Sequence, residues 1–242
     1  MITSKLKSIT RNFINRHFIN RVNQMDEISL KPISYVFGLD RGKPIDRYYI
    51  EKFLQMNRSL IKGNCLEVGD DNYTKKYGNQ DCLSFILKPP SSVSHNKKHN
   101  KLLKNELHYN LSENRVKPVK RFDTIICTQT LNFIEFPDKS INSLFDLLNP
   151  DGHLILTVSG ISQISNYDYD RWGDFWRFTD LSIMKLLCKK FNKNNIKLTT
   201  FGNVATSCMF LQGLSTQDIK EKKVLDFVDK NYQLLICGTA RK

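Results

Sequence analysis

The residues whose types and spacing suggest chemistry most clearly are Glu67 and Gly69, in the stretch 64–71, which reads Asn-Cys-Leu-Glu-Val-Gly-Asp-Asp. Apolar neighbours on both sides of Glu67 indicate a buried strand, and a carboxylate there is costly unless it has partners. Gly69 allows a tight turn and lets a ligand approach the backbone closely. Because doubly wound α/β sheets bind nucleotide-like ligands at such strand ends, we expect a ligand site here. Glu67 then has either a functional role or a hydrogen-bonded structural one.

A second set of reactive side chains lies in the segment 167–177. Three aspartates could accept a proton from a hydroxyl group, namely Asp168, Asp170 and Asp174. Aromatic side chains beside them suit a sugar ring or another flat ligand, namely Tyr167, Tyr169, Trp172 and Trp176. Arg177 could pair with a substrate anion or with a neighbouring aspartate. A packed lid that only closes the core is the structural alternative for the whole segment.

Strands and helices alternate along the rest of the chain and must position these groups. Apolar runs predict strands at 65–68, 82–87, 106–111, 122–127, 153–158, 196–201 and 232–238. Helical spacing predicts helices at 45–61, 73–78, 137–148 and 179–191. This alternation predicts an α/β protein with a Rossmann-like, doubly wound and mostly parallel sheet of about seven strands, with helices on both faces.

The first part of the chain is expected to be a separate extension. At 242 residues the chain suits one α/β domain, which we place at 35–242, and a basic N-terminal extension at 1–34. Apolar residues in the extension recur at helical spacings between Lys and Arg residues, so a basic amphipathic helix is expected. Such a helix could lie on a membrane surface, contact a protein partner, or pack on its own domain.

Composition narrows the location and the chemistry. The basic start is not followed by the apolar run of a secretory signal, and no apolar run is long enough to span a bilayer, so we expect a cytoplasmic protein that could associate with a membrane periphery. The six cysteines form no CxxC pair and are expected to be reduced core residues, with no metal site. The net charge of +13 favours loose contact with polyanions, although it is dispersed along the chain.

Four local strings add a family resemblance. They are residues 41–49 (Arg-Gly-Lys-Pro-Ile-Asp-Arg-Tyr-Tyr), 128–134 (Thr-Gln-Thr-Leu-Asn-Phe-Ile), 159–165 (Ser-Gly-Ile-Ser-Gln-Ile-Ser) and 172–179 (Trp-Gly-Asp-Phe-Trp-Arg-Phe-Thr). With the order of the elements, they make the chain resemble class I S-adenosylmethionine-dependent methyltransferases of the type 11-like group from about residue 35 to the end. More narrowly, the chain looks like methyltransferase-domain proteins found beside glycosyltransferases in bacterial surface-polysaccharide clusters.

The resemblance implies S-adenosylmethionine as the cofactor, bound across the carboxyl ends of the first four strands. The residues that it assigns to this site are Glu67, Gly69, Asp70, Asp71, Tyr73, Lys88, Asn110, Leu111, Thr128, Gln129 and Thr130. Two of these depart from the family pattern. Lys88 stands where an acid usually holds the ribose hydroxyls and cannot accept those hydrogen bonds, and Asn110 replaces an aspartate that meets the adenine amine.

The function expected from the resemblance is methyl transfer to a hydroxyl group of a glycan or glycan precursor. The alternative is a catalytically inactive methyltransferase-like module that serves as a binding or scaffold unit in a polysaccharide pathway. Methylation of RNA is a third reading, based on the net charge, and a nicotinamide-dependent dehydrogenase is disfavoured because the chain lacks a GxGxxG turn. A glycan or small molecule is the expected acceptor, and nucleic acid is a less favoured partner.

Overall fold

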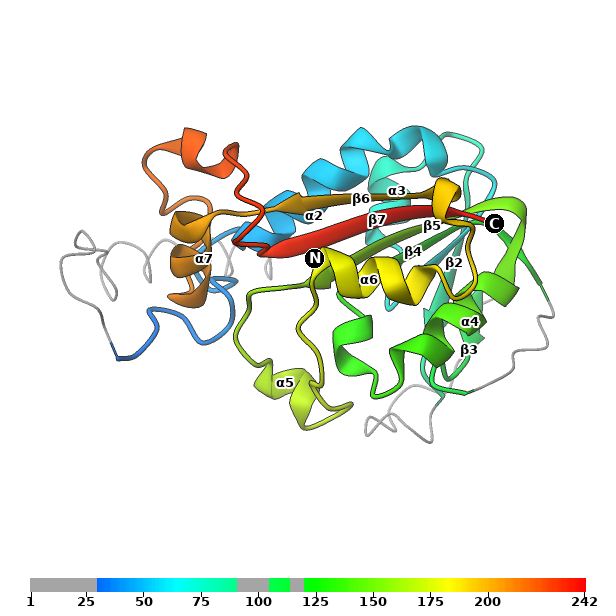
Figure 1. Ribbon diagram of the computed structural model, residues 1–242, viewed down its shortest axis with the longest axis horizontal. Helices are drawn as coiled ribbons and strands as arrows, with labels where there is room; N and C mark the ends of the chain where they lie inside the picture. Colours follow the sequence, from blue (N-terminus) through cyan, green and yellow to red (C-terminus); the bar gives the residue numbers. More distant parts are fainter. Residues whose placement is uncertain (1–29, 91–104, 114–119) are drawn as a thin grey trace, which may run out of the picture.

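Seven strands form a single sheet at the centre of the protein (Figure 1). The computed structural model describes residues 30–90, 105–113 and 120–242. In chain order the strands are β1 (Asn64–Val68), β2 (Leu83–Lys88), β3 (Glu106–His108), β4 (Phe122–Thr128), β5 (Leu148–Ser159), β6 (Ile196–Phe201) and β7 (Leu235–Arg241). They lie in the order β3-β2-β1-β4-β5-β7-β6, and β7 runs antiparallel to both of its neighbours, β5 and β6, whereas the other pairs are parallel. The predicted mostly parallel, Rossmann-like α/β fold is therefore confirmed.

Helices cover both faces of this sheet, as Figure 1 shows. The α-helices are α2 (Ile45–Met56), α3 (Asn72–Tyr77), α4 (Pro137–Leu147), α5 (Asn166–Tyr169), α6 (Asp180–Leu187) and α7 (Val204–Leu211). α2 and α3 lie on one face and α4 and α6 on the other, whereas α5 and α7 lie beyond the carboxyl ends of the parallel strands.

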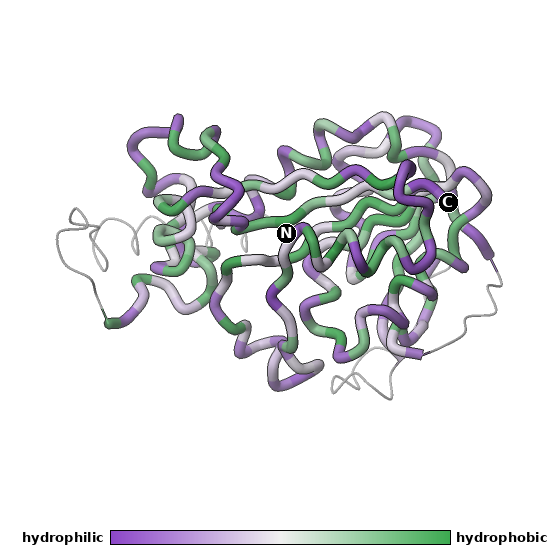
Figure 2. The backbone as a smooth tube through the Cα atoms, viewed as in Figure 1, coloured by the Kyte–Doolittle hydropathy of each residue, from purple (hydrophilic) through white to green (hydrophobic). Residues whose placement is uncertain are grey.

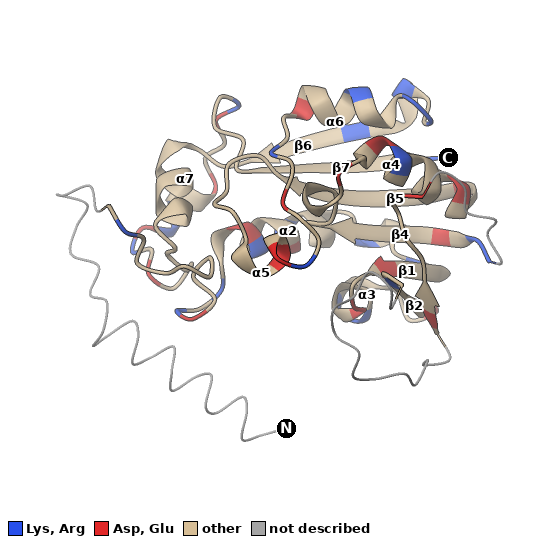
Figure 3. Ribbon diagram, turned by 90° about the horizontal axis from the view of Figure 1, so that it is seen from below, with Lys and Arg blue, Asp and Glu red and all other residues tan. Residues whose placement is uncertain are grey.

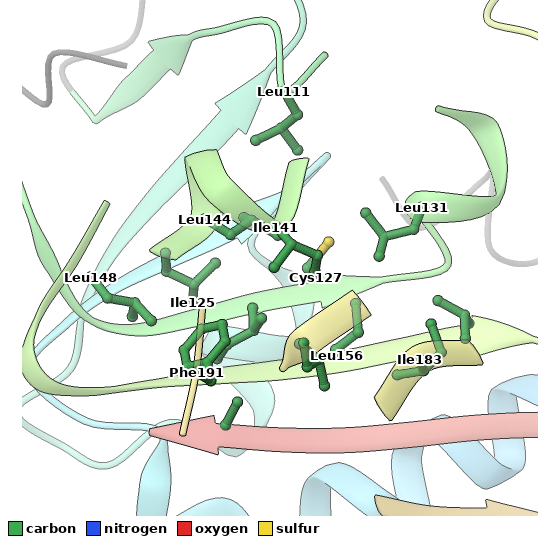
Figure 4. Packing of buried hydrophobic residues seen from close by; sticks show 14 of the residues in the cluster. Leu111, Ile125, Cys127, Leu131, Ile141, Leu144, Leu148, Leu156, Ile183 and Phe191 are labelled. Carbon is green, nitrogen blue, oxygen red and sulfur yellow. The ribbon is translucent and has the colours of Figure 1, made fainter. Parts of the chain in front are cut away.

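Alternating side chains of the strands divide the core into two layers. On β4, Ile125 and Cys127 pack in the layer beneath α4 and α6, whereas Ile126 packs in the layer beneath α2 and α3. Figure 4 shows the first layer, where Ile141 and Leu144 of α4 meet β4. The apolar strands at the centre and the polar connections around them are visible in Figure 2. A strand buried on both faces explains the nearly continuous apolar runs in the sequence.

The helix boundaries follow local signals. Pro137 opens α4 at a position where a missing N–H costs nothing. Thr179 caps α6 as expected, because its hydroxyl accepts the N–H of Ser182 at 3.2 Å and the Ser182 hydroxyl accepts the N–H of Thr179 at 3.0 Å. The predicted helix 45–61 ends earlier, since α2 stops at Met56 and a short 3₁₀ turn follows.

Other features also differ from the sequence predictions. The last strand, predicted at 232–238, is Leu235–Arg241, and α7 was not predicted because its residues have no clear apolar periodicity. Cys65 and Cys82 form a disulfide, although reduced cysteines were expected. The two cysteines are 17 positions apart in the sequence, so their spacing did not indicate a disulfide. The pairing of β1 with β2, with Asn64 opposite Leu83, brings them together.

The predicted N-terminal helix lies in residues 1–29, outside the described residues. Within the described ranges, no helix is long and apolar enough to cross a membrane.

A buried ion pair holds the segment before α2 against the segment after α7. The Arg41 guanidinium donates to both carboxylate oxygens of Asp218, each at 3.0 Å, and the two side chains are 0% and 2% exposed. Ser215 donates its N–H and its hydroxyl to the same carboxylate at 2.9 and 2.8 Å. Burial raises the pKa of Asp218, but the hydrogen bonds from Arg41 and Ser215 outweigh it and hold the pKa below its usual value of 3.8.

We expect Asp218→Ala to lower the free energy of unfolding by about 3 to 5 kcal/mol, because the variant removes one partner of a buried ion pair. Urea denaturation at pH 7 measures this. Asp226→Ala is the matched control, since Asp226 pairs with Lys52 while 64% exposed, and it should cost under about 1 kcal/mol. Because the pKa of Asp218 is lowered in the folded state, its contribution is present above the unfolded pKa and is lost as the pH falls through the folded pKa. Equal losses in the two variants would contradict this assignment.

Candidate active site

The candidate site lies where the order of the strands reverses. β1 pairs in parallel with β2 on one side and with β4 on the other, so the chain leaves β1 toward one edge and later returns to build the other. Ligands of doubly wound sheets bind outside the carboxyl ends of the strands at this point. Gly69 follows β1 with φ +97°, and a Cβ placed on it would meet no atom within 4 Å. The turn after β1 therefore faces open space and lets a ligand reach the backbone.

Glu67, on β1 just before this turn, is hydrogen-bonded to the first residues of α3 after it. Its side chain is 1% exposed, and its two carboxylate oxygens accept the N–H groups of Tyr73 and Thr74 at 3.1 and 2.7 Å. Burial raises the pKa of Glu67 to about 7, although these hydrogen bonds to α3 oppose the shift. Glu67 thus has the hydrogen-bonded structural role that the sequence allowed, and it fixes the start of α3 relative to β1.

The residues after Gly69 shape the turn. Asp70 accepts the N–H of Asn72 at 3.0 Å. Asp71 accepts the hydroxyl of Ser84 at 3.1 Å and lies 2.8 Å from the Lys75 ammonium group. Asp70 is exposed, so its carboxylate can face a ligand above the turn.

Tyr73 is buried on α3, and its hydroxyl accepts a hydrogen bond from Nη1 of Arg47 at 2.9 Å. Arg47 belongs to the first turn of α2, where both acidic and basic residues are visible in Figure 3. The contact joins α2 and α3 above the end of β1. Arg47 was not among the predicted site residues, although it lies in the string 41–49.

The predicted ribose side of the site contains an ion pair. The Lys88 ammonium group, at the end of β2, lies 2.7 Å from Oε1 of Glu106 on β3. The partner of Lys88 is therefore a nearly buried acid of the neighbouring strand, and the sequence alone could not show this pairing because the two residues come from separate strands. Asn110 accepts the N–H of Ser112 at 3.0 Å and Leu111 is buried, so both residues shape the turn after β3.

The turn after β4 brings three elements together. Gln129 has φ +48°, an uncommon backbone conformation for a residue with a side chain. Its Oε1 accepts the Ser159 hydroxyl at 3.0 Å, and its Nε2 donates to Oδ2 of Asp46 at 3.5 Å. Thr128 ends β4, and the Thr130 hydroxyl donates to the Thr128 carbonyl at 3.1 Å. Asp46 and Ser159 were not predicted as site residues, yet each lies in one of the strings that carried the resemblance.

Asn132 holds the segment 167–177, called the aromatic segment below, against the carboxyl ends of β4 and β5. Its carbonyl accepts the N–H groups of Phe175 and Trp176 at 2.9 and 3.2 Å, and its Nδ2 donates to the Trp176 carbonyl at 2.6 Å. Its Oδ1 accepts the N–H of Ser159 at 3.2 Å. Asn132 is buried, so these hydrogen bonds are shielded from water. The segment after β5 consequently lies against the ends of β4 and β5.

Asp174 and Arg177 of this segment are engaged with each other. Asp174 and Arg177 form a two-pronged ion pair at 2.6 and 3.0 Å, and the Asp174 side chain is 1% exposed. Arg177 also donates to the carbonyls of Ser162 and Gln163. Asp174 is therefore unavailable as a base, and the Arg177 guanidinium is occupied by protein acceptors, which supports the structural pair over a substrate anion.

The two remaining aspartates differ in their surroundings. Asp168 accepts the hydroxyl of Ser165 at 2.6 Å, and Ser165 caps the short helix α5. The Asp168 carboxylate thus belongs to a helix cap, whereas Asp170 is exposed at the end of α5. These contacts do not place the carboxylate of Asp168 or of Asp170 at the ends of β1 and β4, where the ligand site is expected.

The aromatic side chains are partly open to solvent. Trp176 is 42% exposed, and its indole N–H donates to the carbonyls of Ile134 and Glu135 at 3.0 and 3.2 Å. Tyr167 and Tyr169 are exposed, and the guanidinium of Arg171 covers the Tyr167 ring at 3.5 Å. Trp172 is half-buried. Because the indole N–H is hydrogen-bonded to the protein, the orientation of the Trp176 ring is fixed while part of its surface stays exposed to solvent.

These features define a class I methyltransferase-like site: an open glycine turn at the switch point of a Rossmann-like sheet, with acidic groups around it. The sequence profile of a family described as methyltransferase domain matches residues 50–197. The chain belongs to this methyltransferase-domain family.

Comparison with individual proteins gives more distant similarities. A curated relative, the probable polyketide synthase 10 of Dictyostelium discoideum, is 26% identical over 98 residues, which cover 37% of this chain and only 4% of that protein. The structure of the N-methyltransferase NodS from Bradyrhizobium japonicum WM9 with S-adenosyl-l-homocysteine is 15% identical, with a TM-score of 0.49 and coverage of 83% of this chain and 88% of that chain. A SAM dependent methyltransferase from Archaeoglobus fulgidus is 12% identical, with a TM-score of 0.49 and coverage of 81% and 94%.

The residues of the site fit S-adenosylmethionine, the methyl donor expected for this class. The open space above Gly69 admits a ligand to the backbone, and the exposed carboxylate of Asp70 beside it suits a positively charged ligand. Among the described residues, no group of three or more His, Cys, Asp or Glu side chains is arranged to hold a metal ion.

The raised pKa of Glu67 predicts a specific dependence of stability on pH. The usual pKa is 4.5 and the folded value is about 7, so the folded state binds more protons than the unfolded state between these values. The free energy of unfolding should therefore fall as the pH rises through this range, by about 3 kcal/mol. In Glu67→Gln this decline should be largely absent, and in Glu135→Gln, which changes an exposed carboxylate, it should persist. Urea titrations from pH 4.5 to 8 measure it, and a wild-type slope retained in Glu67→Gln would refute the assignment.

Proposed function

We propose that this protein transfers a methyl group from S-adenosylmethionine to a hydroxyl group of a glycan or glycan precursor. The observation that supports this acceptor class is the row of partly exposed aromatic side chains fastened beside the carboxyl ends of β4 and β5. Aromatic rings bury one face of a sugar while leaving its hydroxyl groups free for hydrogen bonds. The expected location in the cytoplasm, with a possible contact to the membrane periphery, stays a prediction.

Trp176 is the best-defined part of this acceptor surface. Its indole N–H is bonded to two carbonyls, and its backbone is held by Asn132, so the ring loses little freedom when a ligand stacks on it. Preorganised contact surfaces bind more tightly because the cost of ordering them on binding is small. Tyr169 adds a second exposed ring on the same segment.

The chemistry requires alignment more than a reactive side chain. Bound S-adenosylmethionine supplies a methyl group already activated by a positively charged sulfur. The protein must hold the acceptor oxygen in line with that methyl group and exclude water, and such positioning accounts for a large part of the acceleration in reactions of this kind. Acidic groups around the turn after β1 favour a cationic ligand.

Binding of S-adenosylmethionine and S-adenosylhomocysteine to the full chain, measured by calorimetry, is the first test, followed by a screen of sugar-linked, small-molecule, peptide and RNA acceptors. We expect micromolar affinity for the cofactor, which corresponds to about 8 kcal/mol, and methylation of a sugar-linked hydroxyl. Methylation of another class alone would overturn the glycan proposal. A folded protein without cofactor affinity up to roughly millimolar would instead favour the inactive scaffold alternative.

Replacing the stacking surface should weaken acceptor binding selectively. We expect Trp176→Ala to raise KM for the acceptor about 10-fold, an effect of about 1.4 kcal/mol, while the affinity for S-adenosylhomocysteine stays within a factor of two. Phe227→Ala is the matched control, because Phe227 is an aromatic residue that is 66% exposed outside the segment 167–177. The role of Trp176 would be excluded if both variants had the wild-type KM.

A further inference from the structure

A chain of three polar side chains crosses the site from α2 to β5. Asp46, in the first turn of α2, accepts the side-chain amide of Gln129 at 3.5 Å, and Gln129 accepts the Ser159 hydroxyl at 3.0 Å. The three residues come from the start of α2, the turn after β4 and the end of β5. They meet beside the point where the order of the strands reverses, which is where a methyl donor and its acceptor must meet.

Gln129 adopts a left-handed backbone conformation, with φ +48°. A left-handed conformation costs a residue with a side chain of order 1 kcal/mol or more, and such residues cluster at functional sites. Here the conformation places the Gln129 amide between Asp46 and Ser159. A simple structural turn at this position could use glycine or asparagine without this strain.

Asp46 also has the environment of a proton acceptor. Burial raises the pKa of its carboxyl group above the usual 3.8, although the charge of Arg47, the Arg47 N–H and the Gln129 amide oppose the shift. The Arg47 guanidinium donates to the Tyr73 hydroxyl, and no salt bridge within 4.0 Å joins it to Asp46 among the residues that the structure describes. The charged and titratable groups around Asp46 are therefore Arg47 on its own helix, with Tyr73 of α3 nearby.

We propose that Asp46 accepts the proton of the acceptor hydroxyl during methyl transfer, and that Gln129 and Ser159 are positioning residues that hold its carboxylate. This proposal deepens the proposed function and rests on it. The acceptor oxygen forms a bond to the methyl carbon, the carbon–sulfur bond breaks with its electron pair remaining on sulfur, and the hydroxyl proton moves to the Asp46 carboxylate, which later releases it to water. The structure favours Asp46 over Asp168 and Asp174, whose carboxylates are held in a helix cap and an ion pair.

The decisive variant is Asp46→Asn in the full chain. We expect kcat to fall at least 100-fold, as is typical for loss of a general base, while calorimetry gives a dissociation constant for S-adenosylhomocysteine within a factor of two of the wild type. Asp138→Asn is the matched control, because Asp138 is the second residue of α4 as Asp46 is the second residue of α2, so both variants remove a charge from a helix start. It should keep the wild-type kcat.

A parallel loss of kcat and of S-adenosylhomocysteine affinity in Asp46→Asn would overturn the proposal, because Asp46 would then be holding the cofactor. An unchanged kcat would overturn it as well. For the positioning role, we expect Gln129→Ala to move the acidic limb of the pH profile of kcat to higher pH, since the amide that stabilises the Asp46 carboxylate is lost. A uniform decrease without a shift would indicate only structural damage.

An activity-independent measurement separates this proposal from the proposed function. Carbon NMR of the side-chain carboxyl groups, with Asp46→Asn to assign the signal, should show that the pKa of Asp46 lies above 3.8 in the ligand-free protein. This pKa should fall only if a cation binds beside the carboxylate. Methylation of amines alone would defeat the glycan proposal, while the ratio of Asp46→Asn to wild-type kcat on those amines would still decide the role of Asp46. If no acceptor is methylated, an Asp46 pKa at or below 3.8 overturns the proposal and a raised value supports it.

Discussion

β1 pairs in parallel with β2 on one side and with β4 on the other, and this pairing organises the site. It places the carboxyl ends of β1 and β4 side by side, so that the turns beginning at Gly69 and Gln129 border the same space. Peptide groups within the strands are satisfied by their neighbours, which leaves the turns to meet a ligand. The other residues of the candidate site are arranged around these two turns.

Buried polar contacts then fix the layers that surround the turns. Glu67 holds α3 on β1, Asn132 holds the aromatic segment on the ends of β4 and β5, and Arg41 with Asp218 holds the segment before α2 on the segment after α7. Each of these groups is buried, so removing one partner leaves another polar group without compensation. Specific buried hydrogen bonds can therefore position the loops of the site more sharply than apolar packing alone.

Much of the fold was predictable because it depends on local patterns. The apolar run at 122–127 and the helical spacing at 137–148 indicated β4 and α4 closely, and the Thr179 cap marked the start of α6. The end of α2, the position of β7 and the existence of α7 were not predictable in this way, since tertiary packing decides them. In the site, Glu67 and Gly69 stood out because a carboxylate interrupts an apolar strand and a glycine follows its end.

The alternation of strands and helices, the acid-and-glycine turn and the aromatic segment can each be read from the sequence, because each depends on residues that are neighbours in the chain. The tertiary structure alone decided which charged groups are occupied and which are available. Asp174 is engaged by Arg177, Lys88 by Glu106, and Asp46 meets Gln129 from 83 positions away in the chain. The environment of a carboxylate depends on partners from separate strands and helices, and only folding brings those partners together.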